Sequence, residues 1–231
     1  MEQVTLYHCP ATRSARVLWM LHETVGDAVQ VKTIDLYGGA QYSSEFLALN
    51  LNHGVPVLEI VWNGGTRQVL IESAAIVAFL ADAFPEKALA PPAGGSAERA
   101  DYLQMLHFSS TWADMMLWQI RAHVDLLPEA QRDPRTVARY RRKFVDEVEP
   151  QIAKRLEAHS HICGDRFSAA DCVVGHVVIW ARGYGLCQDG IFRRYLRVVS
   201  KRPAFAKAFA DARQFSPEPP PDSPLAARFN G

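Results

Sequence analysis

The hydrophobic pattern of the chain changes once, near residue 84, and this change limits the folds that the chain can adopt. Before it, short β-prone runs alternate with apolar stripes at helical spacing, in the order β-α-β-α-β-β-α. After it, every periodic segment has helical spacing. A strand–helix–strand unit joins parallel strands by a right-handed crossover, and a hairpin adds antiparallel strands. We therefore expect an α/β unit followed by a bundle of helices.

The N-terminal pattern predicts four strands. They are expected at Gln3–Tyr7, Val29–Asp35, Pro56–Val61 and Arg67–Ile71. The last two runs flank Asn63-Gly64-Gly65, a short glycine-containing loop that is typical of a β-hairpin. Helices are expected from Arg13, at Ser43–Leu49 and from Ser73. This order of elements is that of a thioredoxin-like α/β domain, followed here by an all-α C-terminal helical bundle.

A stretch rich in proline, glycine and alanine separates the two halves. We expect an N-terminal domain at 1–84, a linker at 85–98, an all-helical C-terminal domain at 99–213 and an extended tail at 214–231. Within the helical domain, the pattern predicts helices at Ala97–Leu127, Arg135–Ala158, Ser168–Gly183, Asp189–Ser200 and Pro203–Arg213.

The charge balance argues against several classes of partner. Lys+Arg and Asp+Glu are both 25, so the net charge is zero and binding driven by phosphate attraction is not expected. No run reaches the roughly 18 apolar residues that a membrane span needs. No export signal is visible, so the four separated cysteines are expected to be free thiols. We expect a cytoplasmic protein that acts on small molecules, with neither nucleic acid nor a membrane as partner.

The loop between the first strand and the first helix, residues 9–14 (CPATRS), carries candidate catalytic groups. A cysteine at such a turn is activated by the helix dipole and by neighbouring arginines, here Arg13 or Arg16. The hydroxyls of Thr12 and Ser14 offer donors to a bound thiolate. The alternative is an ordinary helix start beside a loop cysteine.

Two dipeptides of the N-terminal half suit a peptide-like ligand. Glu72-Ser73 lies where a strand becomes a helix, so free N–H groups and the positive helix end favour an anion. The serine suits a carboxylate and the glutamate an ammonium group; the alternative is a capping serine beside a solvated glutamate. Val55-Pro56 opens a strand, and a cis bond there would let the Val55 backbone pair with an extended peptide.

Three features mark the helical half. Ser168 and Asp171 form a capping box ahead of an apolar helix. An aromatic and methionine-rich stripe lines either the core or an apolar pocket; its members include Phe108, Trp112, Met115 and Met116. His159, His161 and Cys163 lack a second ligand pair at zinc spacing, so no metal site is expected.

Taken together, five segments resemble the cytosolic glutathione transferase family, above all its bacterial and fungal members. Leu6–Trp19 is similar to the active-site loop and helix with the pattern S-R-S-x-R-x-L-W, and Asn50–Leu58 to the segment that carries the cis-proline. Glu72–Phe79 is similar to the E-S-x-A-I motif. Gly164–Asp171 and Tyr195–Ala208 match two motifs of the helical domain. The resemblance covers about residues 1–213 and not the tail.

The resemblance implies a thioredoxin-like glutathione-binding domain, a helical second domain and usually a homodimer. It implies that glutathione is the co-substrate, held as a thiolate that attacks a hydrophobic electrophilic small molecule, as in detoxification. No metal is implied. Expected glutathione-binding residues are His53, Val55, Pro56, Glu72 and Ser73. The second-substrate pocket is expected at Phe108, Trp112, Met115 and Met116.

The catalytic residue stays open among four candidates. The first serine of the family pattern falls on Thr12, which is the first choice, and Ser14 is the second. Cys9 precedes a proline, as in the omega-like class, and Tyr7 ends the first strand. Gly54 replaces the basic residue that usually precedes V-P, so the contact to the glycyl carboxylate is weakened.

Two alternatives to a conjugating or reducing transferase remain. One is a non-catalytic binding protein with the same fold. The other is a Cys9-dependent glutathione disulfide oxidoreductase, because a thiolate-forming cysteine changes the reaction to disulfide exchange.

Overall fold

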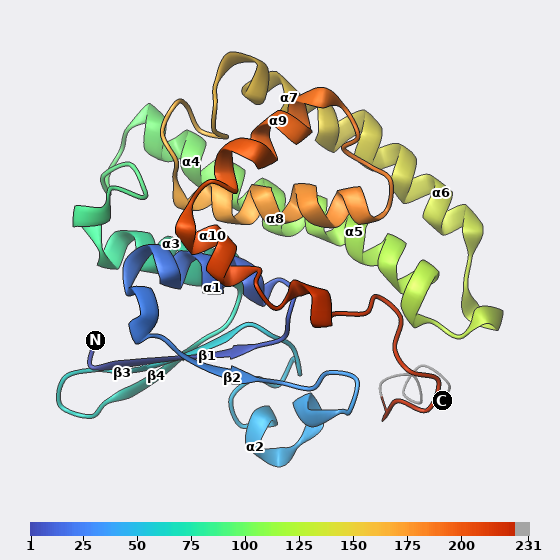
Figure 1. Ribbon diagram of the computed structural model, residues 1–231, viewed down its shortest axis with the longest axis horizontal. Helices are drawn as coiled ribbons and strands as arrows, with labels where there is room; N and C mark the ends of the chain where they lie inside the picture. Colours follow the sequence, from blue (N-terminus) through green and yellow to red (C-terminus); the bar gives the residue numbers. More distant parts are fainter. Residues whose placement is uncertain (225–231) are drawn as a thin grey trace.

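The computed structural model of the chain describes residues 1–224, so the part of the expected tail at 225–231 lies outside the described residues. A four-stranded sheet with its helices forms the N-terminal half, and helices form the rest (Figure 1). The expected fold class, a thioredoxin-like α/β unit followed by an all-helical part, is confirmed.

The sheet contains β1 (Gln3–His8), β2 (Gln30–Thr33), β3 (Val57–Val61) and β4 (Arg67–Leu70), in the spatial order β2-β1-β3-β4. β1 runs parallel to β2 and antiparallel to β3, and β4 completes the hairpin with β3. Leu6 pairs with Leu58, and both side chains are fully buried. Because successive strand residues point to opposite faces, Tyr7 lies on the face opposite Leu6 and packs edge-on against Phe46.

Three helices accompany this sheet: α1 (Ser14–Thr24), α2 (Ser44–Leu47) and α3 (Ser73–Ala83). In Figure 1, α1 and α3 lie between the sheet and the helical half, whereas α2 lies on the other side of the sheet. The hydroxyl of Ser43 caps α2 by accepting a hydrogen bond from the Phe46 N–H at 3.2 Å. The expected order of strands and helices is therefore found.

The helical half contains α4 (Ala97–His107), α5 (Asp114–Arg121), α6 (Pro134–Lys143), α7 (Glu149–Ala158), α8 (Ala169–Gly183), α9 (Gly190–Val199) and α10 (Pro203–Ala208). The π turns Phe108–Ala113 and Phe144–Val148 join α4 to α5 and α6 to α7 without a break, and a third, Ala122–Leu126, extends α5 up to the extended residue Leu127. The helices expected at 97–127 and 135–158 are therefore each found as one continuous helical stretch.

Helix α8 runs through the centre of the molecule (Figure 1) and begins at the expected capping box. The buried carboxylate of Asp171 accepts hydrogen bonds from the N–H groups of Ser168 and Ile162, each at 2.9 Å. Further along, Gly175 allows a close approach of Trp19, because a Cβ there would lie 3.1 Å from Trp19 Cζ3. This close approach brings α8 against α1 of the N-terminal half.

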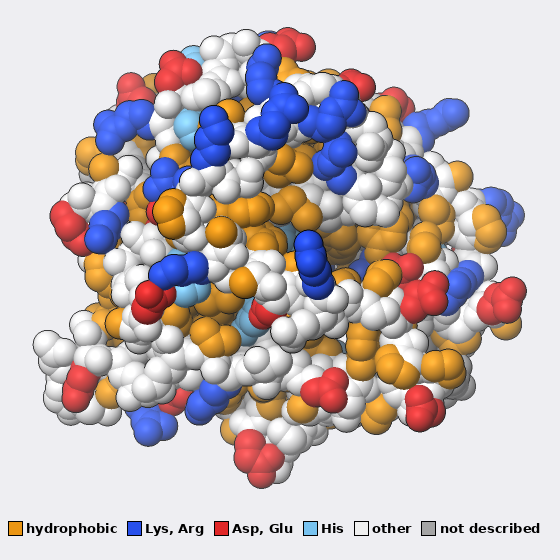
Figure 2. All heavy atoms as spheres, in the orientation of Figure 1, with side chains coloured by type: hydrophobic (Ala, Val, Ile, Leu, Met, Phe, Trp, Pro, Cys, Tyr) orange, Lys and Arg blue, Asp and Glu red, His pale blue; other side chains and the backbone are white. Residues whose placement is uncertain are grey.

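Helix α9 has a buried apolar side and an exposed basic side. Phe192, Tyr195 and Val199 are buried on its inner side, at the spacing of one helical face. Its arginines are exposed on the outer side, and Figure 2 shows Lys and Arg side chains gathered over this part of the surface. This basic area is local, because the whole chain has no net charge.

One buried cation joins the two halves. Arg16 of α1 is fully buried, and its two Nη atoms donate to the two carboxylate oxygens of Asp114 on α5 at 2.7 and 2.5 Å. Its Nε donates to His176 Nδ1 on α8 at 3.1 Å, and Nη1 also approaches the Ser73 hydroxyl at 3.4 Å. We call these four residues the Arg16 cluster. It ties the starts of α1 and α3 to the helical half.

Removal of the Asp114 carboxylate is expected to destabilise the whole molecule. Asp114→Ala leaves the buried Arg16 without its counter-ion, which should lower the free energy of unfolding by about 3–5 kcal/mol. Urea unfolding followed by circular dichroism measures the loss. The matched control is Asp101→Ala, because Asp101 forms a similar two-bond pair with Arg155 at the surface, where a pair contributes about 0–1 kcal/mol. Equal losses in both variants would contradict a central role for the Arg16 cluster.

Candidate functional site

A cleft of about 380 Å³ lies where the two halves meet. The N-terminal half lines it with Arg13, Asn50, Asn52, Gly54, Val55, Pro56, Ile71, Glu72 and Ser73. The helical half lines it with Ser110, Thr111, Asp114, Met115 and Trp118. Four of the five expected glutathione-binding residues are therefore brought together in one cleft, the exception being His53.

The start of α3 forms one end of the cleft. Glu72 precedes the helix with φ of 70° and ψ of 107°, a backbone conformation that side-chain-bearing residues rarely adopt. Ser73 is the first helical residue and is mostly buried, with its hydroxyl near Arg16 Nη1. The first N–H groups of α3 have no partner within the helix, so this end of the cleft is suited to an anionic group.

The loop before β3 forms a second wall. The Val55–Pro56 bond is cis, as the family resemblance implied, and no hydrogen bond to the Val55 backbone is found within residues 1–224. Asn50 holds the loop by donating from Nδ2 to the Gly54 carbonyl at 2.8 Å. His53 does not line the cleft, since its ring packs against that of Tyr42 with centroids 4.9 Å apart.

The helical wall differs from the expected second-substrate pocket. Of the four residues expected there, Met115 lines the cleft, whereas Met116 is fully buried in the core. Trp112 donates from Nε1 to Glu147 at 3.1 Å, away from the cleft, and Phe108 is half-buried. The residues Thr111, Asp114, Met115 and Trp118 share one helical face by their spacing, which is the signal that sequence reasoning missed.

The hydroxyls of the 9–14 loop are occupied by bonds within the protein. Thr12 Oγ1 donates to the Cys9 carbonyl at 2.8 Å, and Ser14 Oγ accepts from the Cys9 N–H at 3.1 Å. Ser14 is fully buried and Thr12 partly so. Within this loop, among the described residues, Arg13 alone lines the cleft.

Ser14 also belongs to a buried chain of polar contacts. Its Oγ lies 2.7 Å from His8 Nδ1, and His8 Nε2 lies 3.1 Å from Asp211 Oδ2. Burial lowers the pKa of His8, so the neutral ring donates from Nε2 to Asp211 and accepts from Ser14 at Nδ1. The order serine–histidine–aspartate is that of an activated nucleophile. However, Ser14 and His8 are fully buried, so this chain of contacts holds the loop rather than reaching a substrate.

The other two candidates, Cys9 and Tyr7, do not line the cleft. Burial raises the pKa of the Cys9 thiol to about 11, and the positive charge of Arg121 only partly offsets this. Such a thiol is almost fully protonated at neutral pH and is a poor nucleophile. The Tyr7 hydroxyl donates to Glu59 Oε2 at 3.2 Å, on the face of the sheet that packs against α2.

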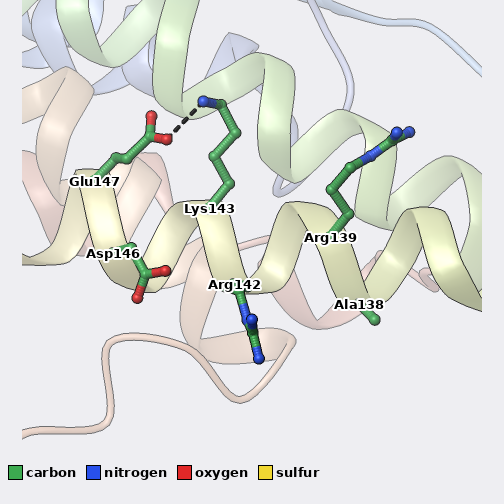
Figure 3. Close-up of a pocket in the computed structure, with 6 residues that line it drawn as sticks. All are labelled: Ala138, Arg139, Arg142, Lys143, Asp146 and Glu147. Carbon is green, nitrogen blue, oxygen red and sulfur yellow. Dashed lines mark hydrogen bonds and ion pairs between the residues drawn. The ribbon is translucent and has the colours of Figure 1, made fainter.

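A second hollow, of about 540 Å³, lies on the outer side of the α6–α7 stretch. Figure 3 shows its lining residues along one helical stretch, with Lys143 paired to Glu147 at 2.6 Å. Charged groups of both signs line it, without any expected site residue. Elsewhere in residues 1–224, no cluster of three potential metal-ligating His, Cys, Asp or Glu side chains is found. None of the described helices is both long and apolar enough to cross a membrane.

The two buried histidines make the fold sensitive to acid. Burial lowers the pKa of His8 and lowers that of His176 well below its usual value, with Arg16 adding to the second effect. In the unfolded chain a histidine titrates near pH ~6.5, so below that pH the unfolded state binds more protons. The contribution of the two neutral histidines to the free energy of unfolding is therefore fully present above about pH 6.5. It falls as the pH decreases from there. Each histidine contributes a slope of up to about 1.4 kcal/mol per pH unit.

Thermal unfolding measured between pH 7.5 and 5.5 checks this loss of stability in acid. His8→Gln should reduce the slope of stability against pH. His107→Gln, at an exposed position, is the control. An unchanged slope in His8→Gln would contradict the assignment to His8.

Comparisons with known proteins agree with this architecture. The family model for the glutathione S-transferase N-terminal domain matches residues 2–82. The disulfide-bond oxidoreductase YfcG of Escherichia coli K12 is 28% identical over 219 residues, which cover 91% of this chain and 96% of the relative. Glutathione S-transferase 3 of Schizosaccharomyces pombe is 27% identical over 247 residues, which cover 95% of this chain and 97% of the relative.

A solved structure extends the likeness to three dimensions. A glutathione transferase family member from Pseudomonas fluorescens Pf-5, with two glutathione molecules bound, superposes with a TM-score of 0.79 at 24% identity. The match covers 90% of this chain and 92% of that one. The fold, the motifs around the cleft and the matching relatives lead to one conclusion: residues 2–82 form a glutathione S-transferase N-terminal domain, and the chain as a whole is similar to glutathione transferases.

Proposed function

We propose that this protein is a glutathione transferase that binds glutathione in the cleft and uses its thiolate against a hydrophobic electrophile. The observation that carries the proposal is the start of α3, where Glu72 and Ser73 open into the cleft beside Val55. The free N–H groups and the serine hydroxyl suit the carboxylate of the γ-glutamyl end, and the Glu72 carboxylate suits its ammonium group. The Val55 peptide group is available to pair with the cysteinyl backbone in the manner of a β-strand.

The remaining parts of glutathione fit the other walls. Asn50 and Asn52 line the cleft on the Val55 side, where the glycyl carboxylate would lie, in place of the expected His53. Met115 and Trp118 offer apolar surface for the second substrate. The thiol would then lie near the 9–14 loop, where Thr12 and Ser14 were the first candidates for its activation.

Isothermal titration calorimetry with glutathione tests the proposal. Ser73→Ala removes one hydrogen bond to a charged group, which is worth about 1.5–3 kcal/mol, so affinity should fall by roughly tenfold or more. Ser96→Ala is the matched control, because it removes a serine hydroxyl that caps α4 at an exposed position. No binding by the wild-type protein would refute the proposal and leave a non-catalytic protein of this fold.

Two reactions are open to a bound thiolate, and both are proposed for test. In conjugation, the thiolate sulfur forms a bond to an electrophilic carbon. Either a leaving group departs with its bonding electrons or, in an addition, the resulting carbanion takes up a proton from solvent. In disulfide reduction, the thiolate attacks a disulfide, forms a mixed disulfide and releases the other sulfur as a thiolate. A second glutathione thiolate then attacks the glutathione sulfur of the mixed disulfide, which forms glutathione disulfide and releases the remaining sulfur of the substrate as a thiolate. Disulfide reduction is proposed because the chain is similar to a disulfide-bond oxidoreductase. This reaction needs no protein thiol, which agrees with the high pKa of Cys9.

Parallel assays distinguish the two reactions. One follows conjugation of 1-chloro-2,4-dinitrobenzene, and the other follows reduction of hydroxyethyl disulfide in the presence of glutathione. Cys9→Ser is included in both. Because Cys9 is expected to stay protonated, both activities should survive in Cys9→Ser, and loss of disulfide reduction alone would instead support the Cys9-dependent oxidoreductase.

We further propose that the protein is a cytoplasmic homodimer that acts in detoxification. Support for the dimer comes from large apolar side chains left exposed on the single chain, above all Leu51, which is 84% exposed. Light scattering of the purified protein checks the dimer, and a monomeric mass would refute it.

A further inference from the structure

We propose that the Arg13 guanidinium, rather than the hydroxyl of Thr12 or Ser14, binds and stabilises the glutathione thiolate in the cleft. This inference rests on the proposed glutathione-binding function and goes beyond it by assigning the group that activates the sulfur. It would replace the neutral hydroxyl donor of the family pattern with a full positive charge.

The position of Arg13 is the first argument. It precedes α1 directly, and within the 9–14 loop, among the described residues, it alone reaches the cleft. Its guanidinium lies between the rings of Trp118 and Trp180, 5.3 Å from each centroid. Two aromatic faces hold a guanidinium in place and leave its edge free for hydrogen bonds. The side chain is therefore oriented before any ligand arrives.

The second argument is that the hydroxyls of the 9–14 loop already have hydrogen-bond partners, whereas the Arg13 guanidinium does not. Thr12 Oγ1 donates to the Cys9 carbonyl, and Ser14 is buried behind it with His8 as partner. Neither residue lines the cleft, so neither hydroxyl is offered to a ligand there. In contrast, no hydrogen bond of the Arg13 guanidinium is found within residues 1–224, and its Nε is buried without one. A cation with unused donors at the cleft wall is suited to an anion.

The local charge is the third argument. Asp114 lies 3.2 Å from Arg13 Nε, but its two oxygens already accept from the two Nη atoms of Arg16. Two guanidinium groups therefore share one carboxylate. Glu72 also lines the cleft and acts on Arg13, but the proposed function assigns its carboxylate to the ammonium group of the ligand, so Arg13 lacks a carboxylate of its own. Burial lowers the pKa of Arg13, Asp114 opposes this and Arg16 adds to it, as expected for a cation that lacks a full counter-charge. An arginine nevertheless stays protonated at neutral pH, so the charge persists.

A thiolate supplies the missing counter-charge. When bound glutathione ionises, the S–H bond breaks, the sulfur keeps the electron pair and the proton passes to solvent; nothing is oxidised or reduced. An opposite charge at close range lowers the pKa of an acidic group by about 1–3 units. A free thiol has a pKa near ~8.5, so a shift of this size makes the thiolate the main form at neutral pH.

The test measures the pKa of the bound thiol directly. Thiolate absorbance near 240 nm is followed against pH for the complex of glutathione with wild-type protein, Arg13→Gln, Arg13→Lys and Thr12→Val. We expect Arg13→Gln to raise the thiol pKa by about 1–3 units, Arg13→Lys to raise it less, and Thr12→Val to leave it unchanged. Arg121→Gln is the control for charge in general, because Arg121 lies near Cys9 but does not line the cleft.

Three outcomes would overturn the inference. In the first, Thr12→Val raises the thiol pKa and Arg13→Gln does not, which returns the role to the hydroxyl. In the second, Arg13→Gln weakens binding tenfold or more with the thiol pKa unchanged, which assigns Arg13 to a carboxylate of glutathione. In the third, Arg121→Gln raises the thiol pKa as much as Arg13→Gln, which makes the effect non-specific.

Failure of the proposed function is distinguishable, because calorimetry then shows no glutathione binding by the wild-type protein. Circular dichroism checks that each variant folds. Should Arg13→Gln not fold, Arg13→Met keeps the side-chain length and the contact with the two tryptophans, and the same rise in thiol pKa is expected.

Discussion

A buried ion pair between Arg16 and Asp114 is the constraint on which the arrangement of the two halves depends. A guanidinium removed from water is tolerated only if its charge and its donors are satisfied, and those of Arg16 are satisfied by α5 and α8. The same guanidinium approaches Ser73 at the start of α3. Docking of the helical half therefore also positions the end of the cleft that suits an anionic group.

Arg13 brings a positive charge to the cleft that Asp114 only partly offsets, because that carboxylate is shared with Arg16. Arg16 uses both of its oxygens from the interior, and Arg13 approaches it from the cleft side. The neighbouring hydroxyls of Thr12 and Ser14 already form hydrogen bonds with the backbone of the loop and with His8. The hydrogen bonds that shape the 9–14 loop thus remove the hydroxyl donors of Thr12 and Ser14 from the cleft and leave a guanidinium there.

Much of the fold was predictable because its signals are local. The four strands, the hairpin at 63–65 and the capping box of α8 each follow from residues within a few positions of one another. Glu72, Ser73, Val55 and Pro56 were recognisable by motif, and the structure places all four at the cleft. The stripe on the first long helix was harder to place, because the π turn at Phe108–Ala113 holds an extra residue. Within α5, Met115 and Trp118 reach the cleft, whereas Met116, which follows Met115 directly, points to another side of the helix and enters the core.

The sequence by itself determined which elements form and in what order, because periodicity, capping and turn preferences act between neighbours in the chain. Only the tertiary structure decided which polar groups remain free for a ligand. That depends on partners distant in sequence: Asp114 lies 98 residues from Arg16, and Asp211 lies 203 residues from His8. The hydroxyls of Thr12 and Ser14 are satisfied by the nearby Cys9 carbonyl and His8 ring, and His8 is held in turn by the distant Asp211. Arg13, in contrast, is left with unused donors at the cleft wall.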